Sequence, residues 1–135
     1  MNLTIQYSFL EVDDHEAALA FYRDTLGLEV RNDVNTEFGR WLTVGPKDQP
    51  EIGVVLQSVG VGRPPTDAQA LRELLAKGSL GGLVFGTDDV DGVFETVRAS
   101  GAEVLQEPMD QPYGVRDCGF RDPAGNMVRF NQSKS

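Results

Sequence analysis

The chain has 135 residues, a length that fits one domain or two small half-domains that share a core. Hydrophobic residues make up 40% and charged residues 24%, which is ordinary for a globular protein and excludes a disordered chain. Asp and Glu outnumber Lys and Arg by 21 to 12, and the resulting net charge of −9 opposes binding to nucleic acids and to anionic membranes. We therefore expect neither as a partner.

The single cysteine, Cys118, excludes an intrachain disulfide and a multi-cysteine metal site. The first residues lack a basic region followed by an apolar run, and no segment approaches the roughly 20 apolar residues that cross a bilayer. We expect a soluble, cytoplasmic protein. Two interpretations of Cys118 are open: a nucleophile activated by the neighbouring Arg116, or a small buried hydrophobic residue.

The first half of the chain predicts one strand, one helix and three further strands. Residues 3–11 alternate in polarity, which is typical of a strand. A helix begins at the acidic residues 13–16, where Asp13 and Glu16 have the spacing of a capping box, and it ends at Gly27. Three further strands are predicted between clusters of Asn, Gly and Pro, at residues 28–33, 38–44 and 52–57.

The second half predicts the same order of elements. A Gly- and Pro-rich connector and a short helix over residues 66–77 come first. A strand at 80–86 precedes a helix that begins near Asp89 and ends at Gly101. The last three strands are expected at 102–105, 113–121 and 126–131, the final two joined by the tight turn of residues 122–126, Asp-Pro-Ala-Gly-Asn.

Matching landmarks recur at a nearly constant offset, which indicates duplication of one supersecondary unit. Gly27 corresponds to Gly101, and Asp14 corresponds to Asp89. Any two helices capped by Asp and Gly would also look alike, and this simpler explanation stays open. The predicted fold class is α+β, with a first β-α-β-β-β module at residues 1–58, a connector with a short helix at 59–79, and a second β-α-β-β-β module at 80–135.

Three features of the chain resemble one protein family. They are residues 18–22, Ala-Leu-Ala-Phe-Tyr, leading to Leu-Gly-Leu at 26–28; the paired β-α-β-β-β order; and the turn at 122–126. The chain resembles the vicinal oxygen chelate superfamily, which contains glyoxalase I, extradiol dioxygenases, some fosfomycin-resistance enzymes and the bleomycin-resistance binding proteins. Gln-Pro-Tyr-Gly at 111–114, followed by Arg116, is most similar to the bleomycin-resistance branch. The resemblance implies the glyoxalase/bleomycin-resistance/dihydroxybiphenyl-dioxygenase fold, a curled mixed sheet with a cleft, and a homodimer.

Enzymes of this superfamily usually hold a divalent metal through His or Glu side chains. The resemblance places the four ligand positions on Tyr7, Val55, Gly82 and Arg129. Val and Gly side chains offer no donor atom, and a guanidinium cation repels a metal ion. The only histidine, His15, is expected in the first turn of a helix, away from the cleft. We therefore expect no metal and no cofactor.

Strand alternation and the resemblance together predict a set of ligand-binding residues that combines aromatic faces with a few polar groups. The predicted set is Tyr7, Phe9, Glu11, Arg40, Trp41, Arg116, Met127 and Arg129. This mixture suits a flat organic molecule. Trp41 could instead belong to the core or to a dimer interface, and Arg129 could pair with Glu11 or Asp117 across the sheet.

The leading hypothesis is a metal-free member of the superfamily that binds a small planar or aromatic molecule and confers resistance by sequestration. The alternative is an enzyme, a glyoxalase-type lyase or isomerase, which uses other metal ligands or a metal-free site with Tyr7 or Glu11 as acid or base. A third hypothesis is an interaction module with a vestigial cleft.

Overall fold

The computed structural model describes residues 1–133 and divides the chain into two compact units, with the boundary between Glu73 and Leu74. The fold is α+β, as predicted. Within the described residues, no helix is both long and apolar enough to cross a membrane.

The elements of the first unit are β1 (Tyr7–Val12), α1 (His15–Leu19), the π-helical η1 (Ala20–Thr25), β2 (Glu29–Thr36), β3 (Gly39–Gly45) and β4 (Gly53–Ser58). After α2 (Pro65–Ala76), which spans the boundary, the second unit contains β5 (Gly82–Gly86), α3 (Val90–Ala99), β6 (Val104–Asp110), β7 (Val115–Arg121) and β8 (Met127–Ser133).

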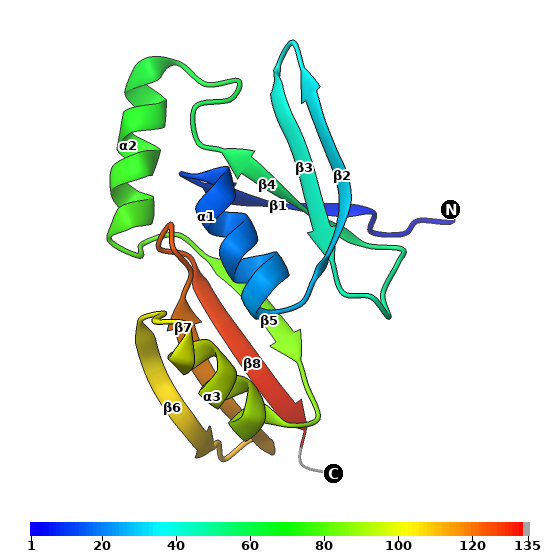
Figure 1. Cartoon of the computed structure of the whole chain (residues 1–135), viewed down its shortest axis with the longest axis vertical. Helices are drawn as coiled ribbons and strands as arrows, with labels where there is room; N and C mark the ends of the chain where they lie inside the picture. Colours follow the sequence, from blue (N-terminus) through cyan, green and yellow to red (C-terminus); the bar gives the residue numbers. More distant parts are fainter. Residues whose placement is uncertain (134–135) are drawn as a thin grey trace. The chain divides into compact units, whose positions relative to one another are not determined.

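The first unit has a four-stranded mixed sheet in the order β1-β4-β3-β2, with β1 parallel to β4 and the other pairs antiparallel. In β1, Leu10 and Val12 are buried, whereas Tyr7 and Phe9 are exposed. The segments α1 and η1 form one continuous helical stretch (Figure 1). This stretch contributes buried side chains, including Leu19 and the fully buried Tyr22. The sheet therefore has one packed face and one face that carries exposed aromatic residues.

The second unit repeats this topology with the order β5-β8-β7-β6, and β5 is parallel to β8 (Figure 1). Phe94 of α3 packs against Phe120 of β7, with ring centroids 5.3 Å apart, and Phe130 of β8 adds an edge contact to Phe120 at 6.3 Å. The prediction of two β-α-β-β-β modules is confirmed.

Each module helix begins at an aspartate whose carboxylate accepts hydrogen bonds from backbone amides of the first turn. Asp14 accepts from Glu16 N at 2.9 Å and Ala17 N at 3.3 Å, and Asp89 accepts from Gly92 N at 3.0 Å. The capping residue of α1 is therefore Asp14, and the predicted Asp13–Glu16 capping box was wrong. Backbone geometry decides which of two adjacent aspartates has the extended conformation that a cap requires.

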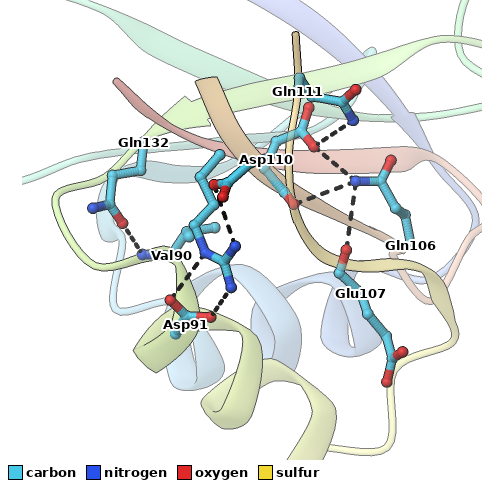
Figure 2. Close-up of polar contacts among 9 residues, drawn as sticks. Val90, Asp91, Gln106, Glu107, Asp110, Gln111 and Gln132 are labelled. Carbon is cyan, nitrogen blue, oxygen red and sulfur yellow. Dashed lines mark hydrogen bonds and ion pairs between the residues drawn. The ribbon is translucent and has the colours of Figure 1, made fainter. Parts of the chain in front are cut away.

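An arginine on the third strand of each module ties the helix to the second strand. Arg40 donates to Asp33 of β2 at 2.8 Å and to Glu16 of α1 at 2.9 Å. In the second unit the same arrangement joins an arginine to Asp91 of α3 and Asp110 of β6 (Figure 2).

That second arginine is Arg116, which lies 2.9 Å from Asp91 and 3.3 Å from Asp110. The hydrogen bonds to these carboxylates raise the pKa of the Arg116 guanidinium, and those to Asp33 and Glu16 do the same for Arg40. Corresponding groups occupy corresponding elements of the two modules. This repeated ion-pair triad strengthens the interpretation that one unit was duplicated.

The predicted turn at residues 122–126 is confirmed. Asp122 Oδ1 accepts from the backbone amides of Ala124, Gly125 and Asn126, each at 2.9 Å. Gly125 has φ +117°, and an added Cβ there would collide with the carbonyl oxygen of Leu75 at the end of α2. Glycine is needed at this position both for the left-handed backbone and for the close approach of α2.

Candidate functional site: an aromatic groove on the first sheet

A groove of about 660 Å³ lies on the first unit, on the sheet face that carries the exposed aromatic residues. Its lining comes from four strands and from two connecting segments, the β2–β3 hairpin tip and the loop after β4. The lining residues are Phe9, Thr36, Glu37, Phe38, Gly39, Arg40, Trp41, Val55, Gln57 and Val61. This volume suits a ligand of drug-like size.

Three aromatic side chains gather at this face because their strands present alternate residues to the same side. The ring of Trp41 meets Tyr7 edge-on at 5.5 Å and Phe9 edge-on at 6.4 Å. Phe9 lies opposite Val55 in the β1–β4 register. The structure therefore brings together three of the predicted ligand-binding residues, and Tyr7 and Phe9 are 46% and 58% exposed.

The hairpin between β2 and β3 forms one end of the groove. Thr36 Oγ1 donates to Gly39 O at 2.7 Å and accepts from Phe38 N at 3.1 Å, which holds the turn closed. Phe38 is 78% exposed at the tip, beside the exposed carboxylate residue Glu37. One end of the groove is thus formed by an exposed aromatic side chain with an acidic side chain next to it.

Arg40 and Glu11, both predicted to contact a ligand, have partners within the chain. Arg40 borders the groove, but its guanidinium pairs with Glu16 of α1, on the helix-facing side of the sheet. Glu11 shares its face with Phe9, and Arg63 Nη1 donates to Glu11 Oε2 at 3.2 Å. The hydrogen bond to Glu11 raises the pKa of Arg63. A ligand role for Arg40 and Glu11 stays a prediction.

In the second unit, Arg129 pairs with the buried Asp117 at 3.1 Å and donates to Gln106 Oε1 at 2.8 Å. Gln106 and Gln111 in turn donate to the same carboxylate at 2.7 Å and 3.0 Å (Figure 2). Burial alone would raise the pKa of Asp117, but the hydrogen bonds from Gln111, Gln106 and Arg129 outweigh it and lower the pKa. The anticipated Arg129–Asp117 pair is present.

The two remaining predicted residues also lie in the second unit. Arg116 belongs to the ion-pair triad with α3 described above, and Met127, partly exposed, is paired with Gly82 in the β5–β8 ladder. Nothing about these positions tests a ligand role.

Three of the four positions that the resemblance assigns to the family's metal ligands, Val55, Gly82 and Arg129, are poor metal donors. Val55 is 3% exposed and has no donor atom, and the charge of Arg129 is held by Asp117. An added Cβ at Gly82 would collide with the backbone carbonyl of Met127, so this position admits no side chain without backbone movement. Across residues 1–133, no three His, Cys, Asp or Glu side chains gather as a possible metal site. The residues present do not fit the metal that the family implies.

The single histidine and the single cysteine both pack against the protein interior. The ring Nε2 of His15 lies 2.9 Å from the carbonyl oxygen of Leu56 and, as its N–H tautomer, donates to it, fastening the start of α1 to β4. Cys118 is fully buried on β7, and burial raises the pKa of its thiol to about 11. This environment favours the small hydrophobic interpretation of Cys118 over the nucleophilic one.

Sequence reasoning missed the hairpin tip, Gln57 and Val61 as lining residues. Gln57 lies two residues after Val55 on β4, so strand alternation could have identified it. The tip was missed because β2 extends to Thr36, beyond the predicted strand, through polar residues that pairing with β3 holds extended. No local sequence pattern predicts Val61 as a lining residue, because its position depends on the path of the loop after β4.

Comparison with models of protein families matches residues 4–130 to the Glyoxalase/Bleomycin resistance protein/Dioxygenase superfamily. The chain belongs to this superfamily, as the resemblance predicted.

Among solved structures, UcmS2 is similar at a TM-score of 0.90 and 37% identity, covering 97% of this chain and 98% of that one. TnmS3, an antibiotic binding protein from Streptomyces sp. CB03234, is similar at a TM-score of 0.77 and 32% identity over 98% of this chain and 97% of its own. A probable lactoylglutathione lyase of Vibrio cholerae serotype O1 is 26% identical over 98% of this chain and 93% of its own length.

The collision at Gly82 predicts that Gly82→Ala lowers the free energy of unfolding by about 2 kcal/mol or more, because β5 must separate from Met127 to make room. Urea denaturation measures this change. Gly86→Ala, on the same strand with no heavy atom within 4 Å of the added Cβ, is the matched control and should change stability by about 0.5 kcal/mol or less. Equal stabilities of the two variants would contradict this interpretation.

The buried thiol predicts a pH dependence. Because the folded state favours protonated Cys118, its contribution to stability is complete below the ordinary thiol pKa of 9.0 and is lost as the pH rises toward the folded-state pKa of about 11. The stability of the wild type should therefore fall relative to Cys118→Ala over this range, by up to about 3 kcal/mol. Parallel pH–stability curves would show that the thiol has an ordinary pKa. Iodoacetamide at pH 8 should label the unfolded chain and spare the folded one.

Proposed function

We propose that this protein binds a small planar aromatic molecule in the groove around Trp41 and protects the cell by sequestering it. The observation that carries the proposal is the position of Trp41 in an apolar groove, with Tyr7 and Phe9 packed edge-on against its ring. A large aromatic ring that faces a groove offers stacking area to a flat ligand at a small cost in side-chain entropy.

The charges near the groove favour a neutral or cationic ligand. Arg40 is neutralised by Glu16 and Asp33, whereas Glu37 adds a carboxylate at the rim. The net charge of −9 would also attract a cation over distance. An anionic ligand would be repelled by the Glu37 carboxylate and by the net negative charge of the protein.

The relatives support a binding role. TnmS3 is described as an antibiotic binding protein, and its similarity to this chain extends over nearly the whole length of both. We extend the proposal to a metal-free homodimer in the cytoplasm. Metal-free binding follows from the donor chemistry of the four ligand positions, and the dimer from the bleomycin-resistance resemblance.

A second candidate function is a glyoxalase-type lyase, which the similarity to the probable lactoylglutathione lyase of Vibrio cholerae favours. A single enzyme assay distinguishes the two functions. A lyase turns over the hemithioacetal of methylglyoxal and glutathione, whereas a sequestering protein does not.

The proposed binding site predicts that Trp41→Ala weakens binding of proflavine, a planar cation, about 10- to 100-fold, because stacking of one aromatic ring contributes about 1–3 kcal/mol. Fluorescence anisotropy of the dye measures the affinity. Quenching of Trp41, the only tryptophan, reports the same event in the wild type. Acridone and 9-anthracenecarboxylate, neutral and anionic three-ring compounds, test the charge preference.

Val30→Ala is the matched control for Trp41→Ala. Val30 is a 37% exposed apolar residue of β2 that does not line the groove, so its truncation should leave the proflavine affinity unchanged. Equal losses in the two variants, or turnover of the hemithioacetal by the wild type, would refute sequestration at Trp41.

Native mass spectrometry should detect a dimer whose mass contains no metal, and dialysis against EDTA should leave proflavine affinity unaltered. The physical reason is that Val55, Gly82 and Arg129 cannot act as metal ligands. One tightly held Ni, Zn, Mn or Fe per chain, with binding lost on chelation, would overturn the metal-free proposal, and a monomer at micromolar concentration would overturn the dimer.

A further inference from the structure

The loop that follows β4 forms one wall of the aromatic groove. Val61 lines the groove, and its Cγ2 lies 3.4 Å from the position of an added Cβ at Gly39, at the start of β3. The loop leaves the sheet through the buried Val59, and Val61 N donates to Ser58 O at 3.1 Å. Gly62, with φ +70°, then turns the chain toward α2.

Arg63 fastens this loop to the sheet. Arg63 Nη1 donates to Val59 O at 2.9 Å and to Glu11 Oε2 at 3.2 Å, and Arg63 Nη2 donates to Glu11 Oε1 at 2.5 Å. The guanidinium therefore binds one carboxylate through two nitrogens and a carbonyl of its own loop. The Glu11 side chain is 17% exposed and that of Arg63 is 27% exposed, so water screens this pair less than an ordinary surface pair.

Glu11 belongs to the same strand face as Phe9, which lines the groove two residues earlier. The ion pair thus connects the groove face of β1 directly to the loop that carries Val61. Because Val59 and Arg63 flank Val61 on either side, both ends of the wall are held: one by burial and one by the bidentate pair.

We propose that Glu11 and Arg63 are positioning residues for ligand binding, which hold Val61 against the groove and thereby slow dissociation of the ligand. This proposal rests on the proposed function of the groove. It assigns Glu11 an indirect role: its carboxylate acts through Arg63 and the loop, without contact to the ligand. A ligand that fills the groove would be retained between Trp41 and the Val61 wall.

The test is the dissociation rate of proflavine, measured by stopped-flow fluorescence. Arg63→Met keeps the length of the side chain and removes the charge, and it should accelerate dissociation about tenfold and raise the Kd to a similar extent. Arg98→Met is the matched control, since Arg98 forms an exposed ion pair with Glu95 at 2.7 Å on α3 and does not line the groove. This control should keep the wild-type rate.

A double-mutant cycle shows whether Arg63 acts through Val61. Val61→Ala should weaken binding about fivefold, and the double variant should bind no more weakly than Arg63→Met alone, because both changes remove the same wall. Additive losses would refute the positioning role. Should Arg63→Met fail to fold, Glu11→Gln, which retains the shape of the side chain, replaces it in the cycle.

The failure of this inference is distinguishable from failure of the proposed function. If Trp41→Ala abolishes proflavine binding while Arg63→Met and Val61→Ala both stay within twofold of the wild-type Kd, the wall inference is wrong and the groove function stands. If Trp41→Ala also binds like the wild type, the groove itself is the wrong site, and the inference falls with it.

Discussion

One constraint organises each half of this protein: a four-stranded sheet is accompanied by a single helical segment of its module, which packs against one sheet face. The helix-facing positions hold the core, such as Leu10 and Val12 in β1 and Phe120 in β7. The residues between them, with the opposite orientation, are left to other uses. In the first unit they are Tyr7, Phe9 and Trp41, and burying them would need a ligand or another surface.

The ion-pair triads show how the same constraint is met twice. A helix that crosses a sheet needs a fixed orientation as well as apolar contact, and Arg40 and Arg116 supply it by joining a helix start to two strands. Both arginines lie on the third strand of their module and meet carboxylates near the N-terminus of the helix, where negative charge is also favoured by the helix dipole. This role as a structural tie explains why Arg40, which borders the groove, need not contact a ligand there.

Three of the positions that the family resemblance assigns to metal ligands are unsuited to that role for different chemical reasons. Val55 is a buried apolar residue, Arg129 is neutralised by Asp117 and Gly82 has no space for any side chain. Restoring a metal site would therefore require backbone movement at β5, a larger change than exchanging one side chain.

The sequence by itself determined the order of elements, the paired modules, the turn at residues 122–126 and two aromatic lining residues of the groove, Phe9 and Trp41, because strand alternation and turn chemistry are local properties. Through the family resemblance it also assigned the metal positions to residues that are poor donors, an assignment that stays a prediction. Only the tertiary structure decided which charged residues form ion pairs within the chain. Glu11 pairs with Arg63 and Arg40 with Glu16, and Val61 enters the groove from a loop. These outcomes depend on where distant segments meet, which spacing along the chain does not encode.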